Sequence, residues 1–268
     1  MRPATRALLL AGLLAAAPAP AAAWPAETMT ALSRDARKLL PRSLSRLLGE
    51  REPQVLDELR RFPPDASRAL ARDLPTGTLR PETLRALEAQ VSRVVGMLRE
   101  GQVEGGLVRL GGLLRIPADL SDPVLAAGPE GWPPGVTREY YALFAANLDR
   151  MPVVLDDPAA LTLETKDLPA LWRSLLERGR DQAPVIRAEL FRGGRVVDHR
   201  RLDYRSPAWA VSSLAYSRAV TGIAATWLAA WREARGDTTR APRAREVKPE
   251  APGDARADDR RPPSPEAP

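Results

Sequence analysis

Few side chains in this sequence of 268 residues have the chemistry that catalysis usually needs. It contains no cysteine and a single histidine, His199. Without cysteine there is no thiolate nucleophile, disulfide or thiolate metal ligand, and one histidine excludes a multi-histidine metal site. Arg115 and Asp119 are four residues apart, the spacing of an ion pair along one face of a helix. Asp65 follows two prolines, a setting typical of a turn or a helix cap.

The strong signatures of enzyme chemistry are also absent. The sequence has no phosphate-binding loop, dinucleotide fingerprint, nucleophile elbow or paired-cysteine pattern. His199 lies in a polar stretch, and we interpret it as a solvated loop residue. Arg218 interrupts the apolar run from Trp209 to Trp231, and we expect it to form a structural ion pair because an isolated buried charge is strongly disfavoured.

The charge balance of the chain is mildly basic. Forty Lys and Arg oppose 34 Asp and Glu, which gives a net charge of +6. This excess is too small to indicate nucleic-acid binding by charge alone, so we predict no specific nucleic-acid partner. With 44% apolar residues, the chain is long enough for one sizeable hydrophobic core or two small ones.

Residues 1–23 have the layout of a secretory signal peptide. A short cationic segment precedes the apolar stretch Ala7–Leu14, and an alanine run ends at Ala23. Cleavage after Ala23 would leave Trp24 as the new amino terminus. Because the apolar stretch is shorter than the roughly 20 residues that span a bilayer, we predict a periplasmic or secreted protein without a transmembrane segment. A retained membrane anchor is the alternative.

The rest of the chain reads mostly as helices punctuated by proline and glycine. Apolar residues recur at helical spacing over six segments, and the pattern predicts helices at 26–40, 84–98, 103–114, 141–151, 168–175 and 207–235. Asp167 is placed to cap the fifth of these helices. The last one is long, apolar and rich in small residues, so we expect it to lie centrally, where small side chains let neighbouring helices approach.

Glycines and prolines mark the less regular parts. Gly105, Gly106, Gly111 and Gly112 fall within a helical pattern, and each costs roughly 1 kcal/mol against alanine. Close helix packing would offset this cost, and an irregular loop is the alternative. A hairpin of 185–191 with 195–204 is plausible, but we favour a helix kinked near Pro184 and then a loop. Residues 236–268 have the composition of a disordered tail.

Two stretches together resemble a known family. Trp24 follows the predicted export signal and leads into the helix 26–40. Much later, residues 115–125 read Arg-Ile-Pro-Ala-Asp-Leu-Ser-Asp-Pro-Val-Leu. This combination resembles the zinc-dependent phospholipase C and single-strand nuclease family. The resemblance implies an all-α, single-domain, multi-helix bundle over residues 24–235, in which the amino-terminal Trp binds zinc through its amine and carbonyl groups.

The match to the family's signature helix is partial. That helix reads His-x-x-x-Asp, followed by a turn with Pro and then a second His. Asp119 and Pro123 match the Asp and the Pro, whereas Arg115 and Leu125 stand at the two His positions. A zinc cluster needs several neutral imidazoles, so the resemblance implies that zinc and hydrolytic activity have been lost.

Other family positions are also changed. A further His-x-x-x-Glu pair falls near Thr137 and Tyr141, and Pro64-Asp65 resembles a Pro-Asp element near the family's site. We expect Tyr140-Tyr141 to fill the space that the metals would occupy. Trp24 has a simpler interpretation as a packed aromatic residue, and Asp119 as a helix cap or as the ion-pair partner of Arg115.

The leading hypothesis is an exported, non-catalytic relative of the zinc phospholipases. It would retain the remnant-site positions Trp24, Asp65, Arg115 and Asp119 and bind a protein or phosphate-bearing ligand in the former active-site cleft. Arg115 would hold phosphate by paired hydrogen bonds, replacing the charge of a metal. One alternative is a phosphodiesterase or lipase with calcium or magnesium on Asp65, Asp119 and the Trp24 terminus. The other is an envelope interaction protein that acts through its tail, 236–268.

Overall fold

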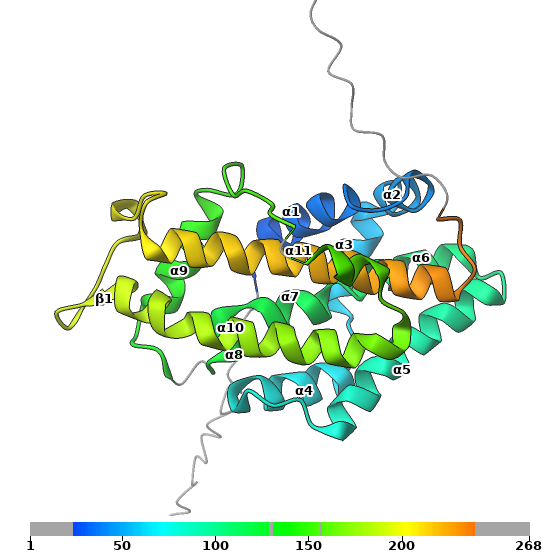
Figure 1. Cartoon of the computed structure of the whole chain (residues 1–268), viewed down its shortest axis with the longest axis horizontal. Helices are drawn as coiled ribbons and strands as arrows, with labels where there is room; N and C mark the ends of the chain where they lie inside the picture. The colour runs from blue at the N-terminus through cyan, green and yellow to red at the C-terminus, as the bar shows by residue number, and fades with distance from the viewer. Residues whose placement is uncertain (1–23, 129–130, 156, 239–268) are drawn as a thin grey trace, which may run out of the picture.

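Helices make up nearly all of the regular structure in the computed structural model, which describes residues 24–128, 131–155 and 157–238 (Figure 1). This confirms the all-α prediction. The predicted signal peptide, 1–23, and most of the predicted tail lie outside the described residues. The α-helices are α1 (Ala26–Arg37), α2 (Arg42–Gly49), α3 (Glu52–Arg60), α4 (Pro64–Asp73), α5 (Pro81–Arg99), α6 (Val103–Gly112), α7 (Arg115–Ser121), α8 (Pro123–Ala126), α9 (Val136–Ala145), α10 (Leu168–Leu190) and α11 (Pro207–Glu233).

Short elements connect these helices. Four 3-10 turns are described: η1 (Leu74–Thr76), η3 (Pro158–Thr162), η4 (Thr165–Asp167) and η5 (His199–Arg201). The strands β1 (Phe191–Arg192) and β2 (Arg195–Val196) pair antiparallel. None of the described helices combines the length and the apolar character needed to cross a bilayer.

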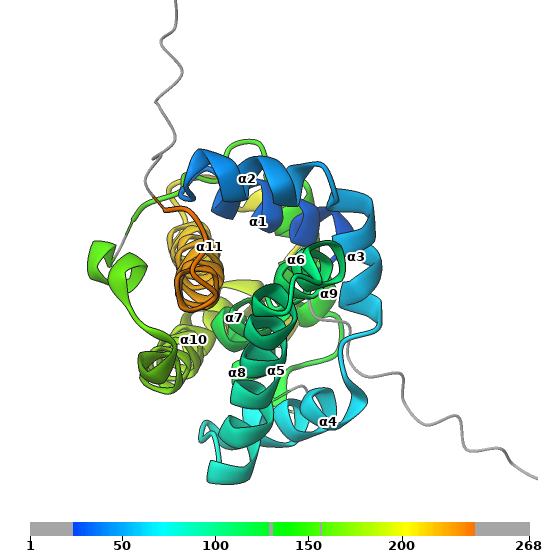
Figure 2. The same ribbon diagram turned by 90° about the vertical axis from the view of Figure 1, so that its right-hand side faces the viewer.

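Helix α11 lies at the centre of the molecule. Figure 2 shows it between α1 and α2 on one side and α10 on the other, with α7 alongside. It is buried along most of its length. A Cβ atom added at Gly222 would lie 2.8 Å from Leu175 of α10 and 3.0 Å from Pro117 of α7. The small residues therefore let three helices approach closely, as the sequence predicted.

The glycines of α6 also serve close packing. A Cβ added at Gly111 would lie 2.4 Å from Val55 of α3, and one at Gly106 would lie 2.7 Å from Leu98 of α5. The helical interpretation of this segment is confirmed, and the cost of glycine in a helix is offset by the approach of α3 and α5. One cluster of buried apolar side chains runs through the described residues from Trp24 to Trp231.

Three local predictions differ from the structure. Pro184 lies inside a helix, α10, as expected, but a minimal hairpin follows Leu190 in place of the favoured loop. Gly193 and Gly194 both have positive φ, 56° and 75°, which suits a two-residue hairpin turn. Helix α9 ends at Ala145 rather than near 151. Asp167 does not cap α10 through its side chain, which accepts a hydrogen bond from the N–H of Glu164 instead.

Candidate functional site

Two short helices position a pair of acids. Arg115 is the first residue of α7, and Asp119 follows one turn later on the same face. Asp122 separates α7 from α8, where its Oδ1 accepts the N–H of Val124 at 2.8 Å. Pro123 occupies the first position of α8, which suits its fixed φ. An Asp cap followed by Pro therefore ends one helix and begins the next.

Arg115 and Asp119 form an ion pair at the edge of this site. The Nε of Arg115 donates to Oδ2 of Asp119 at 3.1 Å, and Nη1 donates to the carbonyl of Leu59 at 3.3 Å. Asp119 is almost inaccessible to solvent, and its Oδ1 has no hydrogen-bond partner among the described residues. Burial raises the pKa of Asp119, although the Arg115 charge and hydrogen bond act in the opposite direction.

Asp122 is a second buried acid in the same cluster. Its side chain is fully buried, and the Tyr141 hydroxyl donates to Oδ2 at 2.7 Å. Burial raises the pKa of Asp122 to about 7, and the nearby Asp119 charge adds to the rise. Hydrogen bonds from Tyr141 and the backbone limit the increase in the pKa. Asp122 therefore titrates near neutral pH.

Aromatic rings pack around the two acids. The indole N–H of Trp24 donates to the carbonyl of Ala118 at 2.8 Å, and the Trp24 ring meets Phe144 edge-on at 4.5 Å between centroids. Trp24 also lies 6.3 Å from Tyr140 and 6.4 Å from Tyr141, centroid to centroid. Trp24 and Tyr140 are buried. We call Trp24, Arg115, Asp119, Asp122, Tyr140 and Tyr141 the acid–aromatic cluster.

The structure brings together three of the four predicted remnant-site positions. Trp24 contacts the residue next to Asp119, and Arg115 pairs with Asp119. Asp65 is not among them, because it lies exposed in the first turn of α4 and pairs with Arg68. The acid–aromatic cluster does not fit zinc, since it contains no imidazole and the Arg115 guanidinium already occupies one side of Asp119.

His199 is not the solvated loop residue that the sequence suggested. Its Nδ1 lies 2.8 Å from Oε2 of Glu139, which also accepts the backbone N–H of His199 at 3.2 Å, and the side chain is only 18% exposed. These hydrogen bonds lower the pKa of Glu139 to about 2. Donor atoms of Glu139, Asp198 and His199 lie within 4.8 Å of one another, close enough to hold a metal ion.

The contacts within that trio also have a structural explanation. Oε1 of Glu139 accepts from the Arg138 guanidinium at 3.1 and 3.2 Å, while Oδ1 of Asp198 accepts the N–H of Arg200 at 2.9 Å. Oε2 of Glu139 and Oδ1 of Asp198, the carboxylate oxygens nearest His199, are likewise already hydrogen-bonded. These contacts join α9 to η5.

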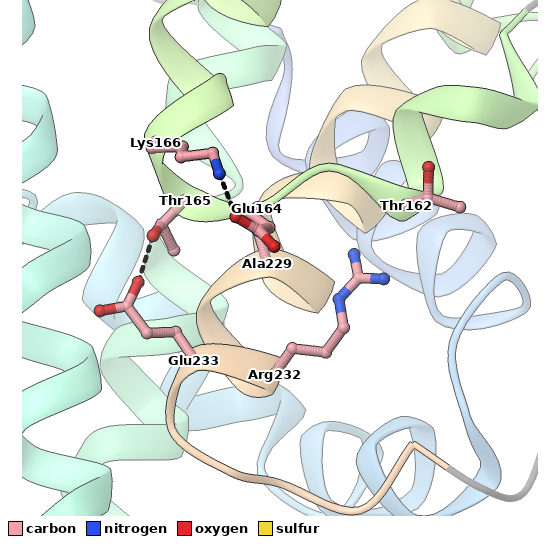
Figure 3. Close-up of a pocket in the computed structure, with 7 residues that line it drawn as sticks. All are labelled: Thr162, Glu164, Thr165, Lys166, Ala229, Arg232 and Glu233. Atoms are coloured by element: carbon pink, nitrogen blue, oxygen red, sulfur yellow. Dashed lines mark hydrogen bonds and ion pairs between the residues drawn. The ribbon is translucent and has the colours of Figure 1, made fainter.

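A cavity of about 490 Å³ lies beside the carboxyl end of α11 (Figure 3). Lys166 pairs with Glu164 at 2.6 Å, and the Thr165 hydroxyl bonds to Glu233. Nη2 of Arg232 donates to the carbonyls of Leu161 and Leu163 at 2.8 and 2.9 Å. The charged groups of this cavity thus already have ion-pair or hydrogen-bond partners.

No known protein family, curated protein or solved structure matches the chain. The fold and the site define the class only as an all-α protein with a closed acid–aromatic cluster. Sequence reasoning missed Asp122, although an Asp followed by Pro at a helix start is a readable cap signal. It also missed the Glu139 partner of His199, which lies 60 residues away along the chain.

Proposed function

We propose that this protein is an exported, non-catalytic helical protein of the zinc phospholipase C type that binds a phosphate-bearing ligand or partner through Arg115. The observation that carries the proposal is the Arg115–Asp119 pair at 3.1 Å, beside a second buried acid. A guanidinium stands at the position where the resemblance implies a zinc ligand. It supplies fixed positive charge without a metal.

The surroundings of Arg115 favour surface recognition over a deep cleft. Trp24, Tyr140 and Phe144 are packed against one another, which supports the view that the chain's own rings fill the space beside the acids. Arg115 is 28% exposed, and its Nη2 has no hydrogen-bond partner in the described part of the chain. A phosphate oxygen would therefore meet Nη2 at the surface, while Asp119 and Leu59 hold the guanidinium in place.

The two alternatives have less support. A calcium or magnesium site on Trp24, Asp65 and Asp119 loses one of its three ligands, because Asp65 is exposed and paired with Arg68. An interaction through the tail concerns residues that lie mostly outside the described part of the chain. The Arg115 proposal is therefore the one that the geometry favours.

The first test measures protection by inorganic phosphate against thermal unfolding. We expect phosphate to raise the melting temperature of the wild type and of Arg68→Ala by more than that of Arg115→Ala. Arg68 is the matched control because it is also an arginine paired with an aspartate on its own helix. Absence of protection in the wild type, or equal protection of Arg115→Ala, would reject the proposal.

A second test addresses catalysis. We expect dialysed protein to contain no stoichiometric zinc and to show no chelator-sensitive hydrolysis of a phosphodiester. Tightly held zinc together with such turnover would overturn the non-catalytic assignment even if phosphate protection were observed.

A further inference from the structure

A second cavity lies at the other end of α11 from the cavity in Figure 3. It measures about 610 Å³ and is formed by the chain that follows α9 and by the segment from η5 to the start of α11. We propose that this cavity binds a small organic anion that carries an aromatic ring. This site is different from the one at Arg115, and the proposal is tested independently of the proposed function.

Two arginines give the cavity its positive charge. Arg150 and Arg200 both line it, and in the described part of the chain neither guanidinium takes part in an ion pair or a side-chain hydrogen bond. The one carboxylate in the lining, Asp203, accepts the N–H of Arg205 at 2.9 Å. Guanidinium groups bind carboxylates and phosphates through paired, charge-assisted hydrogen bonds. The lining therefore favours an anion.

His199 adds a fixed polar group to the same lining. Glu139 accepts hydrogen bonds from the backbone N–H and from the Nδ1 of His199. His199 is therefore held at two points. Because the pKa of Glu139 is lowered to about 2, the carboxylate is ionised and Nδ1 carries the proton. In the neutral ring Nε2 is then an acceptor open to a donor group of the ligand, such as a phosphate hydroxyl, and no described residue bonds to it. This arrangement orients the ring without using its second nitrogen.

Apolar side chains complete the cavity. Trp209 is partly buried against the hydrophobic core, while Tyr204 is 67% exposed. Both line the cavity with Pro152 and Leu202. Flat rings next to cationic groups suit a ligand that combines a ring with an acidic group. The volume falls in the range of small-molecule sites, which is roughly 300 to 1,000 Å³.

The cavity in Figure 3 provides an internal comparison. Its cations, Lys166 and Arg232, are bound to Glu164 and to backbone carbonyls. The cavity beside His199 differs because, among the described residues, its two guanidinium groups have no such partners. The two cavities are similar in size. They differ in that the guanidinium groups of Arg150 and Arg200 have no ion-pair or side-chain hydrogen-bond partner among the described residues.

The test uses isothermal titration calorimetry with phenyl phosphate as the probe. We expect saturable binding at one site per chain, and weakening by about tenfold or more in Arg150→Ala and in Arg200→Ala. Arg60→Ala is the control, because Arg60 is an exposed arginine on α3 and its loss changes the net charge equally. The control should bind within about twofold of the wild type. Both cavity arginines are exposed, so their variants should fold.

Inorganic phosphate and phenol test the two parts of the ligand separately. We expect each to bind at least about tenfold more weakly than phenyl phosphate, since each lacks one of the recognised groups. The proposal is overturned if phenyl phosphate gives no saturable heat, if inorganic phosphate binds as tightly, or if Arg60→Ala loses as much affinity as the cavity variants. Loss of binding in Arg115→Ala but not in Arg150→Ala would also overturn it and would assign the ligand to Arg115.

Discussion

Replacing Asp122 by asparagine should remove a pH dependence of stability that this buried acid creates. Its pKa is raised from 3.8 to about 7 in the folded chain, mainly by burial. The folded state therefore holds the Asp122 proton more tightly than the unfolded state does. The resulting stabilisation is fully present below pH 3.8 and is lost as the pH rises through 7.

The size of the effect follows from the difference between the two pKa values. A difference of about 3 pH units corresponds to about 4 kcal/mol over the whole window. Between about pH 5 and pH 8 the wild type should lose roughly 2.5 kcal/mol of this stability. An asparagine side chain at this position would resemble the protonated acid, because its oxygen can accept from Val124 and its amide can donate to Tyr141. The Asp122→Asn variant should therefore lack this loss.

Urea unfolding at several pH values from about 5 to about 8 measures the effect directly. The free energy of unfolding of Asp122→Asn, minus that of the wild type, should increase by roughly 2.5 kcal/mol across this range. Titrating groups that do not interact with Asp122 cancel in this difference. Asp65→Asn is the control, since Asp65 is exposed, and its curve should run parallel to that of the wild type. Parallel curves for Asp122→Asn and the wild type would refute the reasoning.

Two further predictions concern packing and acid stability. Gly111→Ala should lower the free energy of unfolding by about 1 to 3 kcal/mol, because the new Cβ would lie 2.4 Å from Val55. At Gly96 an added Cβ would meet nothing within 4 Å, so Gly96→Ala should raise the free energy of unfolding by up to about 1 kcal/mol. Urea titrations should therefore show changes of opposite sign in the free energy of unfolding of the two variants. The lowered pKa of Glu139 contributes stability that is present above pH 4.5 and is lost as the pH falls towards 2. Thermal melts of Glu139→Gln should therefore show a weaker decline over that range than the wild type, and an equal decline would contradict the role of His199.

Local patterns predicted those features of the fold that depend on neighbours in sequence. The small residues of α11 and the glycines of α6 indicated close helix packing, and Gly222 and Gly111 show it directly. Helical spacing also predicted that Arg115 and Asp119 would share a face, which the ion pair confirms. These predictions succeed because a helix repeats its faces every three to four residues.

Long-range partners were harder to predict. His199 looked solvated because its neighbours are polar, yet its partner Glu139 comes from α9. Asp65 looked like a member of the site because Pro-Asp resembles a family element, but on α4 the Asp65 side chain faces solvent. The position of a helix relative to the core is decided by packing over the whole chain, and a dipeptide carries no information about it.

The hydrogen bonds that each arginine already makes within the chain indicate which of the two proposed anion sites binds more tightly. Arg115 uses Nε for Asp119 and Nη1 for Leu59, so an incoming anion would find one free nitrogen next to a buried carboxylate. Arg150 and Arg200 keep their whole guanidinium groups available in the described part of the chain. Paired hydrogen bonds to a guanidinium are stronger than a single one. Phenyl phosphate should therefore occupy the cavity beside His199 at lower concentrations than it occupies Arg115.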